Sequence, residues 1–262
     1  MRGYTINYNR QCKLTDEYKN TLVVYKSNHS YLINKKITEV LNSNCWKNRR
    51  CFILAGGLSL VGFDYSMLDS ELTIGINKTF QFYQNATINY SMDSTFYDEL
   101  HLGKLDEVSG EHLIDKWNSF KGVKVFLTPM EFKAFGQDVY LVKRLWKPEI
   151  KTNNLDEGIW GGVNSALGAI SLAAALGANP IYLLGYDFFV PGTQTHCHGG
   201  YPGRNVNDFR SKLEEYKVEL ENFAPLIKNV GIQVVNLNSN SRLRCFPFDT
   251  IERILSCPLT KM

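Results

Sequence analysis

The sequence lacks any apolar run long enough to cross a membrane. Its longest apolar stretch, Leu167–Leu176, is interrupted by Gly168 and Ser171 and is far shorter than the roughly 20 residues that a helical span needs. The first residues, MRGYTINYNRQCK, contain no apolar core of the kind found in secretory signal peptides. These absences predict a cytoplasmic protein with no membrane span.

Paired cysteines and a strong charge are also missing. The six cysteines include no C-x-x-C pair and no regular spacing, which argues against a disulfide framework and is typical of reduced, cytosolic thiols. The formal net charge is only +3, so the composition neither demands nor excludes a nucleic-acid partner. With 262 residues, 44% of them hydrophobic, the chain can bury a substantial core.

Several catalytic signatures are absent. The glycine break in FILAGGLSL (residues 52–60) is not the dinucleotide fingerprint, because Ala55 takes the place of the first glycine, and no G-K-[ST] follows to make it a P-loop. The chain has no G-x-S-x-G elbow and no zinc-deaminase signature. It also lacks the D-x-D motif with which many glycosyltransferases hold a divalent ion. No metal requirement is therefore predicted, although a single Asp can bind Mg²⁺.

The sequence does contain an alternation of short apolar segments and helical patterns. This alternation predicts a single α/β domain, Rossmann-like, with a mostly parallel sheet and helices on both faces. The apolar helix that we expect at 165–178 is buried nearly all round and is capped by Gly177. Strands are predicted at 21–25, 51–55, 72–77, 86–93, 122–129, 139–145, 180–187 and 231–238, and further helices at 37–41, 206–229 and 249–255.

The first 50 residues differ in composition from the rest. They are polar and end in a basic cluster, which is typical of a solvated face and less often of a contact with an anionic acceptor. We predict that residues 1–50 form an extension packed on the domain and that residues 51–262 form the α/β domain itself. The cluster comprises Lys35, Lys36, Lys47, Arg49 and Arg50.

Glycines and polar residues follow the predicted strands at the points where the strands end. The carboxyl ends of parallel strands meet at one edge of a sheet, where α/β proteins bind their ligands. Each such residue also has an ordinary explanation as a turn former or helix cap, and Asn164 and Ser165 are well suited to cap the apolar helix. A helix N-terminus at this edge would also suit a phosphate. The predicted rim comprises Gly56, Gly57, Ser59, Asn77, Asp93, Asp187 and the helix start at Asn164 and Ser165.

The segment THCHGG, residues 195–200, places two histidines in a glycine-rich loop. Core histidines are not expected in such a loop, so His196 or His198 is predicted to act as a general base or acid. A metal site with Cys197 or Asp187 stays open as an alternative, although H-x-H alone supplies too few ligands. Arg204 follows closely and could pair with a phosphate or simply be exposed.

Two blocks of the sequence resemble the glycosyltransferase family 42 sialyltransferases. AGGLSLVGFDYSML is similar to their nucleotide-binding segment, which is close to G-N-G-P-S-L followed by D-Y-S. SALGAISLAAALGANPIYLLGYDFF resembles their S-G-helix-A-L-G-x-x-x-I-Y-L-x-G-x-D-F segment at nearly constant spacing. The same blocks resemble flagellin-modifying glycosyltransferases and archaeal hydroxymethyl-dihydropterin diphosphokinases. In their overall order, WKNRRCFILAGGLSL, NSA, LLGYD and HCHG resemble uncharacterised proteins of tailed phages, over roughly residues 46–250.

This resemblance implies a GT-A-like fold and roles for individual residues. His196 or His198 would stand for the catalytic histidine, although both lie nearer to Asp187 than the family's histidine does to its matching Asp. Phe189 replaces a phosphate-binding tyrosine of the family, so a UDP-sugar is as well expected as a CMP-sugar. Leu58 and Gly56 also depart from the family's proline and asparagine. The resemblance implies that Gly56, Gly57 and Ser59 line the nucleotide. It also implies that Asn77, Asp93 and Ser165 contact the donor.

The sequence therefore predicts a glycosyltransferase that moves a sugar from a nucleotide-sugar donor to an acceptor hydroxyl and has no metal requirement. Its catalytic domain would be residues 51–262. The acceptor would be a hydroxymethylated base in phage DNA or a surface glycan. If a phage encodes the protein, we expect it in the host cytoplasm. One alternative is a diphosphokinase that uses ATP, with Mg²⁺ held by Asp93 and Asp187. Another is a non-catalytic nucleotide-binding protein. Homo-oligomers are common in the family, and the sequence does not test this.

Overall fold

The centre of the protein is a fully parallel eight-stranded sheet. The structure is a computed structural model that describes residues 24–27, 30–33, 35–127, 135–152 and 154–257. The strand order is β12-β11-β4-β5-β6-β7-β8-β3, and every neighbouring pair is parallel. The strands are β3 (Lys35–Lys36), β4 (Cys51–Leu54), β5 (Leu72–Ile76), β6 (Ile88–Ser91), β7 (Val123–Leu127), β8 (Val139–Val142), β11 (Ile181–Leu184) and β12 (Val234–Asn236).

The order of the strands reverses at β4. From β4 the chain adds β5, β6, β7 and β8 on one side, and it later returns to place β11 and β12 on the other side. The carboxyl ends of β4 and β11 therefore border a topological switch point, where open parallel sheets form their ligand crevices. The glycine turn after β4 lies at this point.

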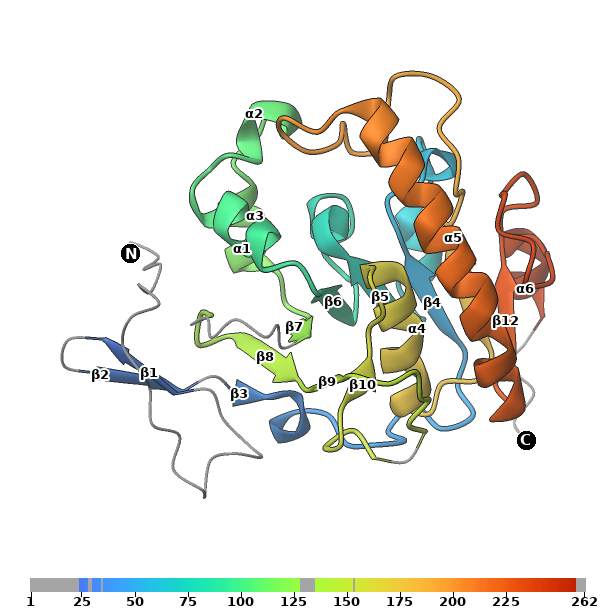
Figure 1. Cartoon of the computed structure of the whole chain (residues 1–262), viewed down its shortest axis with the longest axis horizontal. Coiled ribbons are helices and arrows are strands. Elements are labelled where there is room, and N and C mark those ends of the chain that lie inside the picture. Colours follow the sequence, from blue (N-terminus) through green and yellow to red (C-terminus); the bar gives the residue numbers. More distant parts are fainter. Residues whose placement is uncertain (1–23, 28–29, 34, 128–134, 153, 258–262) are drawn as a thin grey trace.

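Both faces of the sheet are buried. Along β4, Cys51 and Ile53 belong to one apolar cluster while Phe52 and Leu54 belong to the other, as the two-residue period of a strand requires. Helices α4 (Ser165–Ala175) and α5 (Val206–Asn229) cover the first face (Figure 1). The second face packs against α1 (Ser94–His101), α3 (Leu113–Ser119) and α6 (Ile251–Ser256). The predicted fold class, a mostly parallel α/β sheet with helices on both faces, is confirmed.

Helix α4 has the ends that the sequence predicts. The Asn164 side chain caps it by accepting a hydrogen bond from the Leu167 N–H at 2.9 Å. At the other end Gly177 adopts φ +90°, and the N–H groups of Gly177 and Ala178 bond back to Ala174 and Ala173. This is a Schellman cap, which requires the left-handed conformation that glycine adopts without strain.

Other segments differ from the prediction. The single strand expected at 139–145 is divided, because β9 (Arg144–Leu145) leaves the main sheet and pairs with β10 (Ile159–Trp160). The helix expected at 37–41 is only a 3₁₀ turn, η2 (Ile37–Glu39). Three helices were not predicted, namely α1, α2 (Asp106–Ser109) and α3. Three 3₁₀ segments were not predicted either, namely η3 (Leu58–Leu60), η4 (Tyr65–Leu68) and η5 (Asn77–Gln81). Residues 128–129 of one expected strand lie outside the described residues.

The described part of the N-terminal segment joins the domain. Strands β1 (Val24–Ser27) and β2 (Ser30–Ile33) form a hairpin, and residues 21–23 of the strand expected there lie outside the described residues. β3 extends the sheet beside β8. Trp46 is buried against α4, and its backbone N–H donates to Leu176 O at 2.8 Å. Arg50 pairs with Glu71 and donates to Ile254 O at 2.9 Å, so this member of the basic cluster is structural. The domain boundary at residue 50 stays a prediction.

No helix in the described ranges has both the length and the apolar character needed to cross a bilayer. The five cysteines within those ranges are free thiols, and Cys12 lies outside them.

Candidate functional site

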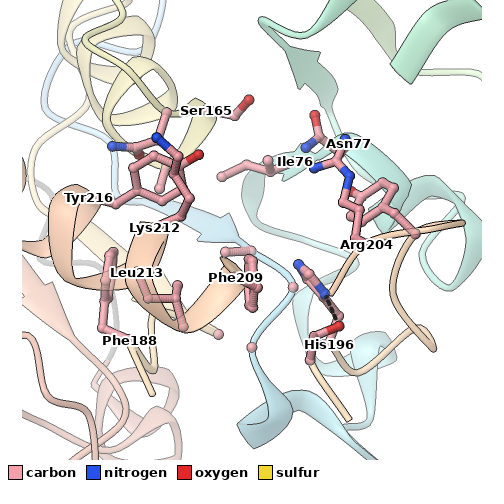
Figure 2. A pocket seen from close by; sticks show the side chains of 18 of the residues that line it. Ile76, Asn77, Ser165, Phe188, His196, Arg204, Phe209, Lys212, Leu213 and Tyr216 are labelled. Atoms are coloured by element: carbon pink, nitrogen blue, oxygen red, sulfur yellow. Dashed lines mark hydrogen bonds between the residues drawn. The ribbon is translucent and has the colours of Figure 1, made fainter. Parts of the chain in front are cut away.

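A cavity of about 620 Å³ opens at the carboxyl ends of β4, β5, β6 and β11. Its volume falls in the range of small-molecule sites, about 300–1,000 Å³. Figure 2 shows that Asn77, Arg204 and His196 lie on one side of it, across from Phe188, Leu213 and Tyr216. The structure gathers ten of the residues singled out from the sequence in this lining, namely Gly56, Gly57, Asn77, Asp93, Asn164, Ser165, Asp187, His196, His198 and Arg204.

Ser59 is the exception, because it does not line the cavity. Its N–H and hydroxyl both donate to the Asp187 carboxylate, at 2.8 and 2.5 Å, and Asn238 donates to the same carboxylate at 2.8 Å. A Cβ atom on Gly57 would lie 2.4 Å from Gly185 O and 2.6 Å from Asp187 Cγ, so only glycine allows this approach. Asp187 therefore fastens the glycine turn to the end of β11.

Phe188, the next residue along the chain, lines the cavity in a strained backbone conformation. Its φ is +54°, which is rare for a bulky side chain. The segment after β12 braces the preceding backbone: Ser241 Oγ donates to Tyr186 O at 2.6 Å, and Arg242 N donates to Asp187 O at 2.9 Å. Strain of this kind persists where surrounding contacts enforce it, often at functional sites.

The two histidines of the 195–200 loop lie directly against the glycine turn. The loop is fixed there by a hydrogen bond of 3.0 Å from Cys197 N to Gly56 O. A Cβ atom on Gly56 would lie 2.9 Å from His196 Cδ2 and 3.0 Å from His198 Nε2. Glycine at this position thus provides the room in which both imidazole rings pack on the β4 turn.

Both imidazoles are held in their neutral form at pH 7. Burial, followed by the positive charges of Arg204 and Lys78, lowers the pKa of His196 to about 4. Burial also lowers the pKa of His198 well below its usual range, with smaller contributions from His196 and Lys78. His196 Nδ1 bonds to Thr195 Oγ1 at 2.8 Å, whereas His198 Nδ1 has no partner among the described residues. Each neutral ring has one nitrogen that can accept a proton.

Lys78 is a residue of this region that the sequence analysis missed. Lys78 follows Asn77 in η5, and its side chain is completely buried. Its Nζ atom lies 3.4 Å from His198 O and 3.3 Å from Gly200 O, so it contacts the backbone of the histidine loop. Burial lowers the pKa of Lys78 to about 8. Lysines are rarely buried, and nothing in the sequence marks this one, except that it follows a strand end.

Asn77 presents an unsatisfied acceptor to the cavity. Its φ is +50°, and its backbone oxygen accepts a hydrogen bond of 3.0 Å from Asn89 Nδ2. Its side-chain oxygen is buried with no partner among the described residues. Because a buried unsatisfied acceptor is costly, a ligand hydroxyl or amino group that donates to it would be favoured.

Positive charge is found at the mouth of the cavity. Arg204 lies 3.5 Å from Asp93 Oδ2, is half-exposed and stacks over the Tyr201 ring at 4.7 Å. Asp93 also caps α1 by accepting from Thr95 N at 2.9 Å. Lys212 on α5 lines the opposite wall (Figure 2). Arginine and lysine so placed can pair with phosphate oxygens.

The N-terminus of α4 completes the upper wall. The Asn164 side chain both caps the helix and donates to Glu219 at 3.0 Å, and Val163 N also donates to Glu219. Ser165 and Ala166, the first residues of α4, line the cavity, and first-turn N–H groups have no acceptor within a helix. This wall can therefore serve an anion.

The carboxylates that the sequence analysis offered to Mg²⁺ are already bonded within the protein, Asp93 to Arg204 and Thr95 and Asp187 to Ser59 and Asn238. Within the described ranges, no three His, Cys, Asp or Glu side chains are grouped closely enough to hold a metal ion.

Comparisons with known proteins support the fold. No family model and no curated protein sequence matches the chain. Among solved structures, the chain is similar to the MAf glycosyltransferase from Magnetospirillum magneticum AMB-1, with a TM-score of 0.51 and 12% identity over 84% of this chain and 36% of that one. This chain therefore spans about a third of that enzyme's length. A weaker likeness is to the sialyltransferase CstII from Campylobacter jejuni in complex with CMP-3FNeuAc, with a TM-score of 0.41 and 16% identity over 76% of this chain and 84% of that one. Another is to a Cst-II variant in complex with CMP, with a TM-score of 0.39 and 16% identity over 76% of this chain and 85% of that one. What the first likeness shows is the fold alone: the chain has a GT-A-like, Rossmann-type α/β architecture.

Proposed function

We propose that this protein is a glycosyltransferase that takes a nucleotide sugar into the cavity at the switch point and transfers the sugar to an acceptor hydroxyl. The observation that carries this proposal is the pair of histidines that pack on the glycine turn and line the cavity. A neutral imidazole facing a ligand cavity is equipped to take a proton from a hydroxyl group. Across the cavity, the α4 N-terminus and Lys212 offer partners for phosphate.

In the proposed reaction, His196 accepts the proton of the acceptor hydroxyl. When Nδ1–H donates to Thr195 Oγ1, the Nε2 lone pair is free to take that proton. The acceptor oxygen then forms its bond to the anomeric carbon while the bond from that carbon to the phosphate oxygen breaks. Arg204 and the N–H groups of the α4 start stabilise the negative charge that develops on the departing phosphate.

The remaining predicted residues take supporting roles in this proposal. Asn77 would bind a donor hydroxyl or amino group through its unsatisfied oxygen. Asp187 would position the glycine turn, since its carboxylate accepts hydrogen bonds from Ser59 and Asn238. Phe188, Phe209 and Tyr216 line the cavity and offer aromatic surface to the nucleobase.

The donor is proposed to be a UDP-sugar or a CMP-sugar, and the acceptor a glycan or a hydroxymethylated DNA base. The phage affinity, the DNA acceptor and the pterin diphosphokinase alternative find no support in the comparisons. Asp187, one of the two carboxylates proposed for Mg²⁺ in that alternative, is engaged by Ser59 and Asn238, and no observation favours the alternative. Oligomeric state and location in the cell also stay predictions.

The test is a thermal-shift screen with CMP, UDP, GDP, ADP and their sugar conjugates, each with and without Mg²⁺. A ligand that binds only the folded state raises the melting temperature by mass action. We expect a CMP- or UDP-sugar to give the largest shift without Mg²⁺ and the variant Asn77→Gly, which tolerates the same positive φ, to reduce it. A shift with ATP and Mg²⁺ alone would replace this proposal with the diphosphokinase.

A further inference from the structure

Lys78 occupies an unusual position for a lysine that forms no ion pair. It is 0% exposed, and within the described residues no carboxylate lies within 4.0 Å of its Nζ atom. The two carboxylates that act on its charge are already engaged: Glu111 pairs with Lys116, and Asp106 pairs with His112. A buried cation without a counter-ion costs stability, so its persistence calls for a reason.

The contacts of Lys78 converge on the histidine loop. Besides the carbonyl oxygens of His198 and Gly200, its Nζ atom lies 5.7 Å from the centre of the Tyr201 ring. The loop turns its carbonyls toward the lysine by means of Gly199 and Gly200, at φ +76° and +92°. The H-G-G sequence thus provides the backbone that the lysine binds.

Lys78 reaches the loop without lining the cavity, whereas His196, His198 and Tyr201 do line it. The neighbouring Asn77 lines the cavity as well. Of these two successive residues after β5, Asn77 therefore faces the cavity and Lys78 contacts the loop.

We propose that Lys78 is a positioning residue, which fixes the histidine loop on the glycine turn by a buried cation bound to its carbonyl groups. The part of this inference that concerns catalysis rests on the proposed function. The positioning does not, because it can be measured in the free protein. The charge of Lys78, a smaller cause than burial, also opposes protonation of both histidines. The groups that face Lys78 are Cys197 and Tyr201 in the loop, the two histidines, and the engaged carboxylates Asp106 and Glu111.

The experiment is an NMR titration of histidine Cε1–H signals together with amide hydrogen exchange, in the wild type and in Lys78→Met and Lys78→Arg. Methionine keeps much of the length and loses the charge, whereas arginine keeps the charge. We expect Lys78→Met to move the His196 titration midpoint upward, because a nearby cation no longer opposes protonation. Exchange of the Cys197 amide, which donates to Gly56 O, should quicken at least tenfold. Lys78→Arg should keep the low midpoint.

The matched control is Lys151→Met, which also removes a lysine charge, but one that pairs with Glu149 and Glu157 rather than with any group that faces Lys78. It should leave the His196 midpoint and the Cys197 exchange unchanged. Equal midpoints and exchange in wild type and Lys78→Met would overturn the proposal. So would a Lys78→Arg midpoint as high as that of Lys78→Met, since the charge would then have no effect.

A measurement on the wild type covers the case in which Lys78→Met does not fold. Lys78 should lose its proton near pH 8, so the Gly199 and Gly200 amide signals should shift with a midpoint near that pH. Signals that do not move between pH 7 and pH 9.5 would overturn the proposal. Each of these readouts is obtained without a substrate, so a failed nucleotide screen with a positive titration would reject the glycosyltransferase and keep the role of Lys78.

Discussion

The imidazole rings of His196 and His198 stack on each other, with centroids 4.7 Å apart and planes inclined by 22°. Tyr201 contacts both rings edge-on at 5.2 Å, and Phe209 lies 4.5 Å from His196. The pair is therefore fixed as one unit, but the two rings differ in their hydrogen bonds. Among the described residues, His196 Nδ1 has a partner, which orients its ring, and His198 Nδ1 has none. This difference is our reason for assigning the base to His196.

The first prediction is that His196→Ala lowers turnover about 10²- to 10⁴-fold, the usual contribution of a general base. The affinity for the donor should change little, because the proposed phosphate partners are Arg204, Lys212 and the N–H groups at the start of α4. Turnover by a nucleotide-release assay and affinity by calorimetry measure the two effects. His112→Ala, which removes an exposed histidine, is the control and should behave as wild type. Undiminished turnover in His196→Ala would refute the assignment.

The second prediction concerns the pH dependence of stability. The pKa of His196 falls from 6.5 in the unfolded chain to about 4 in the fold, so between these values the unfolded state binds more protons. Stability should therefore be fully present above pH 6.5 and fall as the pH drops toward 4, by at most about 3 kcal/mol for this residue. Urea unfolding at several pH values measures the slope, and His196→Gln should flatten it. An identical slope in the variant would contradict the pKa shift.

The third prediction tests why Gly56 is a glycine. An alanine Cβ at this position meets the ends of the His196 and His198 rings rather than backbone, so the rings can move aside and the fold should persist. Turnover should nevertheless fall at least tenfold, because small displacements of a base are costly. Gly192→Ala is the control, since a Cβ there meets nothing within 4 Å. If Gly56→Ala retains full turnover, ring placement on the glycine turn has no catalytic importance.

Much of the fold follows from local patterns in the sequence. Helix α5 was predicted at 206–229 and is observed at those residues, and α4 has the expected cap residues, Asn164 and Gly177. These signals are local, since caps and helical periods are determined by neighbouring residues. The small helices α1, α2 and α3 were missed because they are only 8, 4 and 7 residues long and depend on tertiary packing, for example of Trp117.

The candidate site was predictable only in part, for the same reason. Gly56, Asn77 and Asp93 follow strands, and a parallel sheet brings strand ends together whatever its details. Ser59 and Lys78 could not be placed, because their roles depend on partners 128 and 120 residues away in the chain. A sequence pattern gives no register for such contacts. Lysine is moreover expected at the surface, whereas Lys78 is completely buried.

The last prediction concerns the core beneath the cavity, where Gly168 lies inside α4. Alanine within a helix normally stabilises relative to glycine by about 1 kcal/mol. Here, however, a Cβ would lie 2.1 Å from the Tyr90 hydroxyl oxygen and 2.9 Å from Cζ, in a fully buried setting. Overpacking of this kind costs about 1–3 kcal/mol, so Gly168→Ala should destabilise. Urea denaturation of the variant measures the effect.

Tyr90→Phe provides the matching test, because it removes the atom nearest to the new Cβ. The Tyr90 hydroxyl is buried without a partner among the described residues, so its removal alone should cost little. In the double variant the loss caused by Gly168→Ala should shrink by about 1 kcal/mol or more, a coupling expected only for residues in contact. Strictly additive free energies of unfolding would show that Tyr90 is not the obstacle, and that α4 packs on β6 less closely than these distances indicate.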